Sequence, residues 1–452
     1  MMHFDLDRAA AITGARLDVP DGAPVADQIV GMIQDSRGVQ RGNLYVALPG
    51  ARVDGHTFVA DAADRGAAAA LVTRPVDAPL AQLIVADAVV AMGDLARAWR
   101  AELSARVVGI TGSNGKTTVK TLLAAILQRR ALTLATRGNY NNEIGVPLTL
   151  SALGPQHRYA VVEMGCGQPG DIEYLAGIAR PDIAVVTNAG PAHLERLGSI
   201  EGVARTKGEL FSALPPGGSA VLNRDDVFFE YWSGLCGDCH RVSFGEHPAA
   251  DVRLTGDEAQ WRVETPGGCF DLVLQLPGHH NRMNALTATA AALALDIELS
   301  TIAEGLAAVD SLSGRLAARE LPGGWRLIDD SYNANPASLY AALQVLAEYP
   351  APRWLVIGNM AELGRDSAKL HREIGQNARA LGIERIFAVG ELAALVADSF
   401  GSGGSSFVDH DELASTLEAL LHPGVTCLVK GSRSAHMESV IERLIAPGGP
   451  AC

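Results

Sequence analysis

The chain has 452 residues, which is too long for one ordinary domain and predicts two or three. Its 48% of hydrophobic and 19% of charged residues are typical of a soluble globular protein, and the net charge of −14 argues against nucleic acid as the main partner, because phosphate backbones are held by surplus lysine and arginine. No apolar run reaches the length of a transmembrane helix and residues 1–16 lack a basic-then-apolar signal, so we expect a cytoplasmic protein without membrane insertion.

Three regions follow one another, and together they predict an α/β fold with three domains. Residues 1–85 mix short apolar runs with turn signals, which indicates a small N-terminal α/β domain. In residues 86–316, strands and helices alternate as in a P-loop-type ATPase domain, with buried parallel strands predicted at 107–110, 159–162 and 183–186. Residues 317–452 alternate again and predict a Rossmann-like domain, with strands at 325–328, 354–357, 386–389 and 426–429.

A glycine-containing segment lies between the strand at 107–110 and an amphipathic helix, and reads Thr111-Gly112-Ser113-Asn114-Gly115-Lys116-Thr117-Thr118. Glycines let backbone N–H groups approach a phosphate, and a helix N-terminus favours anions. We expect Lys116 to reach the β- and γ-phosphates of a nucleotide and the Thr117 hydroxyl to hold Mg²⁺. The segment departs from the common P-loop pattern, because Ile110 stands where the first glycine is expected. An ordinary glycine turn is the alternative.

Polar residues follow the next two predicted strands, at the edge where a parallel sheet forms its ligand crevice. Glu163 ends the second strand, where its carboxylate is placed to bind Mg²⁺ on a nucleotide, or to pair with an arginine. His193 follows the third strand and is either a ligand or a surface residue. Lys207 occupies an apolar-stripe position of the helix predicted over 199–214, with Ser199 as its N-cap. It is a base, a salt-bridge partner, a carbamate formed with carbon dioxide, or a lysine that reaches past the stripe to solvent.

Six cysteines in so long a chain do not form a disulfide framework. Cys236 and Cys239, followed by His240, match the C-x-x-C-H spacing of haem attachment. Covalent haem of this type normally accompanies export, and no second ligand pair has the spacing of a zinc site. We interpret the pair as part of an ordinary reduced loop, and the sequence assigns it no role.

These motifs together resemble the Mur ligases, and similar segments are spread over nearly the whole chain. The loop at 111–117 is similar to the family's ATP loop. Residues 139–147 and 192–209 resemble segments that come after this loop in members of the family. The resemblance implies that ATP is bound by residues 111–117 and that Thr117 and Glu163 hold one Mg²⁺. It also implies that His193 and a carbamylated Lys207 hold a second one.

Further ATP contacts are implied by the same resemblance. Asn281 and Asn284 lie at the start of a helix similar to the one that contacts adenine in the family. Arg315 resembles a phosphate-binding arginine at the hinge into the last domain, and Asp330 a ribose contact. Taken alone, the two asparagines and Asp330 are capping or turn residues, and Arg315 is a surface arginine.

The outer regions indicate which member of the family the chain resembles. Segments 35–37, 44–48 and 54–58 resemble the domain that holds a UDP-sugar peptide, which implies substrate contacts by Ser36, Arg37 and, in the central region, Asn142. Segments 358–364 and 429–434 are similar to those of the member that adds D-alanyl-D-alanine. The implied reaction joins this dipeptide to the terminal carboxylate of UDP-N-acetylmuramoyl-tripeptide, at the expense of ATP and through an acyl phosphate, in peptidoglycan synthesis.

In that reaction Lys116, His193 and Lys207 are the expected catalytic residues, and we expect a monomer. The alternatives are another Mur-type amino acid ligase, folylpolyglutamate synthase, a P-loop kinase, or a nucleotide-binding protein without activity. A kinase shares the phosphate loop but needs no amine. A binding protein does not need Glu163, His193 and Lys207 together. The sequence leaves open whether the tripeptide ends in lysine or diaminopimelate, and which group deprotonates the amine; His193 and Glu195 are candidates.

Overall fold

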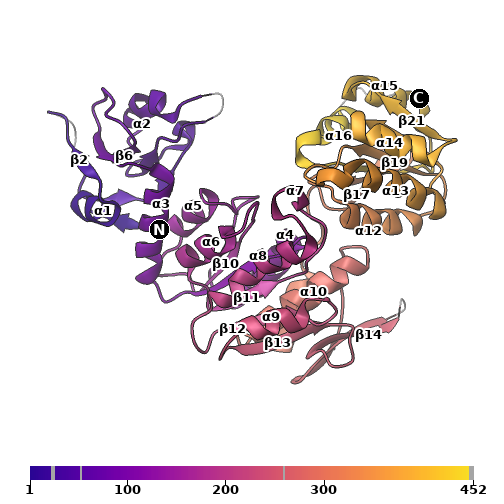
Figure 1. Cartoon of the computed structure of the whole chain (residues 1–452), viewed down its shortest axis with the longest axis horizontal. Helices are drawn as coiled ribbons and strands as arrows, with labels where there is room; N and C mark the ends of the chain where they lie inside the picture. The colour runs from indigo at the N-terminus through magenta and orange to yellow at the C-terminus, as the bar shows by residue number, and fades with distance from the viewer. Residues whose placement is uncertain (22–25, 51–52, 258–259, 447–452) are drawn as a thin grey trace.

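The computed structural model describes residues 1–21, 26–50, 53–257 and 260–446. Three α/β units follow one another along the chain, and the N-terminal and C-terminal units lie on either side of the central one (Figure 1). Each unit is built on its own largely parallel sheet, which confirms the predicted α/β fold class. Among the described residues, no helix combines the length and the apolar character needed to cross a lipid bilayer.

The N-terminal unit has a sheet of strand order β2-β7-β6-β5-β4, in which only the β2–β7 pairing is antiparallel. Its central strands are short apolar runs that are buried on both faces, as a parallel sheet under helices requires. The elements are β1 (His3–Phe4), α1 (Leu6–Thr13), β2 (Arg16–Asp18), β3 (Ile29–Val30), β4 (Met32–Ile33), η1 (Ser36–Gly38), β5 (Leu44–Val46), η2 (Gly55–Phe58), α2 (Val59–Asp64), β6 (Ala69–Val72) and β7 (Ala81–Ile84).

The central sheet has the order β16-β15-β14-β13-β12-β11-β8-β10-β9, and its β14–β15 and β15–β16 pairings are antiparallel. The strands predicted at 107–110, 159–162 and 183–186 are confirmed as β8, β10 and β11, which lie side by side. The strands are β8 (Arg106–Thr111), β9 (Thr133–Ala135), β10 (Tyr159–Glu163), β11 (Ile183–Val186), β12 (Ser219–Asn223), β13 (His240–Gly245), β14 (Val252–Asp257), β15 (Gln260–Thr265) and β16 (Gly268–Asp271).

Helices cover both faces of the central sheet, because its strand residues alternate between two apolar cores. Val108 and Ile110 of β8 face one core, with α4 (Lys116–Gln128), α10 (His279–Leu293) and α11 (Leu299–Ala307). Val107 faces the other core. The helices on that side are α3 (Ala88–Ala101), α5 (Gly145–Ser151), α6 (Asp171–Ala179), α8 (Ile200–Ser212) and α9 (Phe229–Leu235).

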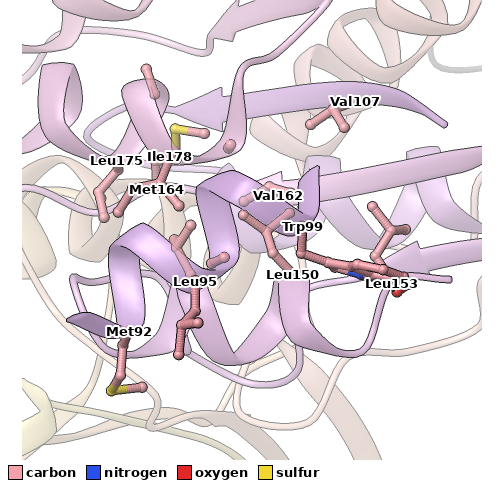
Figure 2. Close-up of a cluster of buried hydrophobic side chains, with 14 of the residues drawn as sticks. Met92, Leu95, Trp99, Val107, Leu150, Leu153, Val162, Met164, Leu175 and Ile178 are labelled. Carbon is pink, nitrogen blue, oxygen red and sulfur yellow. Dashed lines mark hydrogen bonds between the residues drawn. The ribbon is translucent and has the colours of Figure 1, made fainter. Parts of the chain in front are cut away.

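The second of these cores is shared with the N-terminal unit, and α3 forms the junction (Figure 2). Met92, Leu95 and Trp99 of α3 pack among side chains of the central unit, and the Trp99 indole N–H donates to the Leu153 carbonyl at 2.8 Å. Phe4 and Leu71 belong to the same continuous cluster. The N-terminal and central units are therefore joined by buried apolar surface, and burial of such surface stabilises a protein by about 25 cal/mol per Å².

The C-terminal unit has the sheet order β17-β18-β22-β19-β20-β21, with only the β17–β18 pairing antiparallel. All four predicted strands are confirmed, as β18, β19, β20 and β22, and the buried residues of its two apolar clusters all come from residue 316 onward. The elements are β17 (Ala317–Leu321), β18 (Trp325–Asp330), α12 (Pro336–Ala347), β19 (Arg353–Gly358), η3 (Gly364–Asp366), α13 (Ser367–Ala380), β20 (Arg385–Val389), α14 (Glu391–Phe400), β21 (Gly404–Phe407), α15 (His410–Leu420), β22 (Thr426–Lys430), η4 (Arg433–Ala435) and α16 (Glu438–Ile445).

Candidate active site

A cavity of about 1300 Å³ lies where the carboxyl ends of β8, β10 and β11 meet the C-terminal unit. Most of the predicted site residues reach it, although they come from segments far apart in the sequence. The predicted residues that line it are Ser113, Asn114, Gly115, Lys116, Thr117, Asn142, Glu163, His193, Asn281, Asn284, Arg315 and Asp330. The remaining predicted residues, which do not line the cavity wall, are Thr111, Gly112, Lys207, Ser36 and Arg37.

The phosphate loop is shaped by two glycines in conformations that other residues rarely adopt. Gly112 has φ +150°, and a Cβ atom there would lie 1.8 Å from the Thr187 hydroxyl oxygen. Gly115 has φ +84°, and a Cβ atom there would lie 2.2 Å from Asn284 Oδ1. The loop is fixed to the strand beside it, because the Asn114 backbone N–H donates to Asn188 Oδ1 at 3.1 Å. Close approach, rather than turn formation alone, requires both glycines.

Lys116 begins α4 and closes the loop on itself, with its Nζ donating to the Gly112 carbonyl at 2.6 Å. Burial and the charge of Lys207 lower the pKa of Lys116 to about 8. A phosphate that entered the loop would accept from this ammonium and restore its charge. Gly115 is the N-cap of α4 and has no side chain to cap the first turn, which leaves the helix N-terminus available to an anion.

Glu163 is almost completely buried at the end of β10, and the structure gives it several partners. Its carboxylate accepts from the Thr117 hydroxyl at 3.0 Å and from Asn141 Nδ2 at 2.8 Å, and Lys120 Nζ lies 3.0 Å away. Burial opposes ionisation, but Lys120 and Lys116 hold the pKa of Glu163 below its ordinary value. The charged partner is therefore Lys120 on α4, and not the arginine that the alternative interpretation predicted.

Lys207 lies on α8, whose N-cap is Ser199 as predicted. Its side chain is 2% exposed, so the alternative of a lysine that reaches solvent is wrong. Among the described residues, Lys207 Nζ donates a hydrogen bond to Cys166 Sγ at 3.5 Å. No described carboxylate forms an ion pair with Lys207. Burial of an ammonium group without an anionic partner is unfavourable.

His193 begins the short helix α7 (Leu194–Leu197), with a φ of +55°. Its Nδ1 lies 2.5 Å from Oε2 of Glu362, a residue of the C-terminal unit. Burial, together with the charges of Lys207 and Lys116, lowers the pKa of His193, although Glu362 opposes this. The ring is therefore mostly neutral near pH 7, the form in which a histidine binds a metal ion. Because Lys207 acts on both Lys116 and His193, the three predicted catalytic residues lie close together.

The asparagines of α10 stand in its first two turns and are buried. Asn281 Nδ2 donates to the Pro277 carbonyl at 2.7 Å, and Asn284 Nδ2 donates to Asn281 Oδ1 at 3.1 Å. Asn284 also lies against Gly115 of the phosphate loop. His280 lines the cavity beside them, and burial lowers its pKa to about 4. This wall is thus neutral and partly aromatic.

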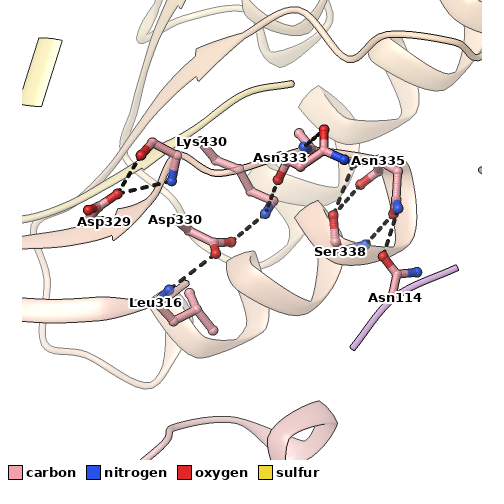
Figure 3. Close-up of polar contacts among 10 residues, drawn as sticks. Asn114, Leu316, Asp329, Asp330, Asn333, Asn335, Ser338 and Lys430 are labelled. Carbon is pink, nitrogen blue, oxygen red and sulfur yellow. Dashed lines mark hydrogen bonds and ion pairs between the residues drawn. The ribbon is translucent and has the colours of Figure 1, made fainter. Parts of the chain in front are cut away.

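Arg315, at the hinge into the C-terminal unit, and Asp330 of that unit form another wall of the cavity. Arg315 Nη2 donates to the Thr117 hydroxyl at 2.8 Å, and its guanidinium lies 4.3 Å from the centre of the Tyr332 ring. Asp330 accepts from Lys430 Nζ at 2.5 Å and from the Leu316 backbone N–H at 3.2 Å (Figure 3). Both residues are therefore at the cavity, but Asp330 already has a buried cationic partner.

A further hydrogen bond crosses from the C-terminal unit to the phosphate loop. Asn335 is the N-cap of α12, and its Nδ2 donates to Asn114 Oδ1 at 2.7 Å (Figure 3). With the contacts of Arg315 and His193, this makes three polar links between the two units around the cavity. The C-terminal unit thus contributes one side of the site, as a closing domain does.

The predicted substrate residues lie apart from one another. Asn142 is at the cavity, where its Oδ1 accepts from the Gly145 backbone N–H at 2.9 Å at the start of α5. Ser36 and Arg37 are in η1 of the N-terminal unit. The Ser36 hydroxyl bonds Asp61, whereas the Arg37 side chain is 84% exposed and pairs with Asp35 at 2.7 Å. A substrate that reached both places would span the N-terminal and central units.

Sequence reasoning did not assign several cavity residues. Lys120, which does not line the cavity but pairs with Glu163, could have been found, because it lies one helical turn beyond Lys116 on α4. Asn188 and Lys430 stand at or just beyond a strand's carboxyl end, which is the usual signal. No sequence signal indicated that Glu362 would reach His193 across two units.

The cysteine pair lies away from this cavity, at the end of α9. Cys236 and Cys239 are free and buried, and burial together with its neighbour raises the pKa of Cys236 to about 12. The described residues contain no cluster of three or more histidine, cysteine or acidic side chains that could hold a metal ion. The interpretation as a reduced loop agrees with this environment.

The residues at the cavity fit a nucleotide with Mg²⁺. The Thr111 hydroxyl oxygen is buried without a hydrogen-bond partner among the described residues, and the first turn of α4 lacks a side-chain cap. Thr117 and Glu163 offer the hard oxygen ligands that Mg²⁺ prefers. Because no described protein cluster is complete, phosphate oxygens and water must supply the remaining ligands, which is usual for this ion.

Comparison with known proteins covers almost the whole chain. Models of the Mur ligase family match residues 28–105 (catalytic domain), 110–292 (middle domain) and 314–433 (glutamate ligase domain). The chain is 43% identical to the UDP-N-acetylmuramoyl-tripeptide–D-alanyl-D-alanine ligase of Escherichia coli, over 91% of this chain and 92% of the relative.

Solved structures agree with this comparison. A crystal structure of MurF from Acinetobacter baumannii has a TM-score of 0.89 at 34% identity, over 98% of this chain and 99% of that one. The MurF ligase of Thermotoga maritima, solved in complex with ADP, has a TM-score of 0.79 at 28% identity, over 92% and 96%. The chain therefore belongs to the Mur ligase family.

Proposed function

We propose that this chain is the ATP-dependent ligase that joins D-alanyl-D-alanine to the terminal carboxylate of UDP-N-acetylmuramoyl-tripeptide, with release of ADP and phosphate. The main support is one cavity in which the phosphate loop, Glu163 and His193 meet a wall of the C-terminal unit. A ligase must shield a reactive acyl intermediate from water, and such a wall can exclude water from the site. Relatives that carry the name of this ligase are 33–43% identical to the chain over at least 91% of its length.

In the proposed reaction, an oxygen of the tripeptide carboxylate attacks the γ-phosphorus of ATP, and ADP leaves. The amine of the dipeptide then forms the new C–N bond, and the C–O bond to phosphate breaks. Lys116 and the N-terminus of α4 hold the transferring phosphoryl group and offset its charge. Arg315, which reaches Thr117 from the C-terminal unit, adds a second cation on the other side.

Metal ions and a modified lysine belong to this proposal. Thr117 and Glu163 would hold one Mg²⁺ and His193 and a carbamylated Lys207 another; when bound, the ions neutralise charge on the phosphate oxygens. A carbamate turns the buried cation of Lys207 into an anion with oxygen atoms that can bind Mg²⁺, which would explain why a lysine without an anionic partner is buried at this position. Lys207→Ala should then lose activity, and added short carboxylates should restore part of it. Restoration by an amine instead would indicate a cationic role.

The decisive measurement is phosphate release from ATP, with product masses, in the presence of the UDP-tripeptide. D-alanyl-D-alanine should support turnover and yield a pentapeptide, whereas single amino acids should not. A product that carries phosphate and accumulates without any amine would establish a kinase. Turnover with a single amino acid would assign the chain to another Mur-type ligase, and turnover with glutamate and a folate to folylpolyglutamate synthase.

The remaining parts of the proposal follow from the same function. We assign residues 1–85 to the UDP-sugar-peptide domain, 86–316 to the ATP domain and 317–452 to the C-terminal domain, which is consistent with the separate five-, nine- and six-stranded sheets. Ser36, Arg37 and Asn142 would contact the UDP-tripeptide, while Asn281, Asn284 and Asp330 would contact the nucleoside of ATP. The protein would act as a cytoplasmic monomer in peptidoglycan synthesis, and so in cell shape and division, without nucleic acid as a partner.

A further inference from the structure

Several carboxylates line the cavity, and most of them are already occupied. The neighbours of four are buried lysines or backbone N–H groups, which fix the carboxylates in place: Glu163 with Lys120, Asp330 with Lys430, Asp171 with Gly167 and Gln168, and Asp87 with Val89 and Val90. Two further carboxylates, those of Glu143 and Glu362, also line the cavity. Burial and the negative charges of Asp87 and Glu143 raise the pKa of Tyr174, which lies at the end of the cavity near α3.

Glu362 lies at the other end, in the loop between β19 and η3 of the C-terminal unit. Its φ of +61° is uncommon for a residue with a side chain, and the His193 that it meets has a φ of +55°. Such left-handed conformations outside glycine are costly and cluster at functional sites. Two of them, in different units, bring one carboxylate oxygen to 2.5 Å from an imidazole nitrogen.

This carboxylate has capacity for another partner. One oxygen of Glu362 is bound to His193, and the side chain is still 47% exposed. A carboxylate offers about four lone-pair positions, so the second oxygen is available from the cavity. The charges of Lys116 and Lys207 act on the same His193, which places Glu362 beside the phosphate end of the cavity.

The second substrate of a ligase that adds a dipeptide arrives as an ammonium ion. In a site whose other groups bind phosphate, Lys116 and Arg315 repel an incoming cation. An anionic group is needed at the place where the amine enters, and it must not already be neutralised by a buried lysine. Glu362 is the cavity carboxylate beside these cations that meets this requirement.

We propose that Glu362 binds the ammonium group of the incoming D-alanyl-D-alanine beside the acyl phosphate. The bound ammonium loses one proton to water before its nitrogen attacks the acyl carbon, and the departing phosphate takes the second proton. This inference rests on the proposed ligase function, and it gives the C-terminal unit a direct part in binding the amine substrate. Closure of that unit then brings the amine into place in the same movement that completes the cavity wall.

The test uses the full-length protein with Glu362→Gln, which removes the charge and keeps the shape. The matched control is Glu373→Gln on α13 of the same unit, because its side chain is 45% exposed, pairs with Lys369 at 3.8 Å and does not line the cavity. The KM values for ATP, UDP-tripeptide and dipeptide are measured separately. We expect the KM for the dipeptide to rise about 10- to 100-fold, the size of a lost charged hydrogen bond, with much smaller changes in the other two.

A competition assay separates amine binding from a structural effect. Hydroxylamine is largely uncharged at neutral pH and traps an acyl phosphate as a hydroxamate, so it has no need for an ammonium site. In mixtures of the two nucleophiles, Glu362→Gln should lower the ratio of pentapeptide to hydroxamate by about tenfold or more, and Glu373→Gln should leave the ratio as in the unmodified protein.

Each other outcome has a distinct meaning. If both products fall together, or if the KM for ATP rises instead, Glu362 only orients His193 and the proposal is wrong. If the KM for the UDP-tripeptide rises alone, the carboxylate binds that substrate and not the dipeptide, which also overturns it. If the unmodified protein forms no hydroxamate from ATP and UDP-tripeptide, the failure lies with the ligase function itself.

Discussion

Two buried lysines, on helices that cover opposite faces of the central sheet, give a direct test of the electrostatic argument, because the same substitution should change stability in opposite directions. Lys207 is 2% exposed and has a thiol at 3.5 Å as its hydrogen-bond partner, whereas Lys120 is 4% exposed and lies 3.0 Å from Glu163. We compare Lys207→Met with Lys120→Met in protein without ligands, in buffer purged of carbon dioxide. Methionine retains most of the packing of the lysine methylenes.

The magnitudes follow from the partners. The desolvation penalty of a buried ion is several kcal/mol, so Lys207→Met should raise the free energy of unfolding by about 2 kcal/mol or more. Lys120→Met leaves the buried Glu163 without its cation, which should lower the free energy of unfolding by about 3–5 kcal/mol.

Urea unfolding, followed by tryptophan fluorescence, measures both changes. Trp232 is a suitable reporter because its indole N–H donates to the Ala204 carbonyl in α8, the helix that carries Lys207. A loss of stability in Lys207→Met, or no change, would refute the reasoning, since it would mean that the amine has an anionic partner or is uncharged. Lys207→Met should also be inactive, because the proposed carbamate cannot form.

Four further predictions concern the phosphate loop, the cysteines and the N-terminal unit. Lys116→Ala should lower the rate of phosphate release by about 10²- to 10³-fold without loss of fold, checked by circular dichroism. In the unmodified protein, bound phosphate raises the lowered pKa of Lys116, so above about pH 8 the complex binds more protons than the free protein. ATP affinity should therefore be full below about pH 8 and fall by up to tenfold per pH unit above it. Calorimetry in two buffers should detect the proton uptake. Among the described cysteines, the exposed Cys269 should react quickly with a thiol reagent, while Cys236 and Cys427, whose pKa values burial raises to about 12, should react only after urea is added. Arg37→Ala should raise the KM for the UDP-tripeptide about tenfold and leave that for ATP within twofold; equal changes in both would contradict a substrate contact.

The strands of this fold were predictable because a parallel sheet covered on both faces needs continuous apolar runs. Val107 to Ile110, Ile183 to Val186 and the strands of the C-terminal unit are such runs, and each is bounded by turn residues. The glycine loop and Lys207 were also predictable, the first from its position between a strand and a helix and the second from its place on an apolar stripe.

Side-chain contacts between segments far apart in the sequence were not predictable, because they depend on how the elements meet in the folded protein. Glu163 was expected to bind Mg²⁺, with an arginine partner as the alternative, and the helix next to β10 brings Lys120 to it instead of an arginine. Asp330 was expected to be free for a ribose, yet a parallel neighbour, β22, ends in Lys430 beside it. The meeting of His193 with Glu362 depends on left-handed conformations at both residues, which are uncommon outside glycine and which the sequence does not indicate.

The apolar cores predict how many parts of the molecule melt together. Because α3 buries residues of the N-terminal and central units in one continuous cluster, neither unit can lose its structure without exposing the other's core. The C-terminal unit has apolar clusters of its own, and the contacts that hold it at the cavity are polar ones. Calorimetry should therefore resolve two cooperative transitions rather than three, and a nucleotide bound between the units should bring the two closer together in temperature.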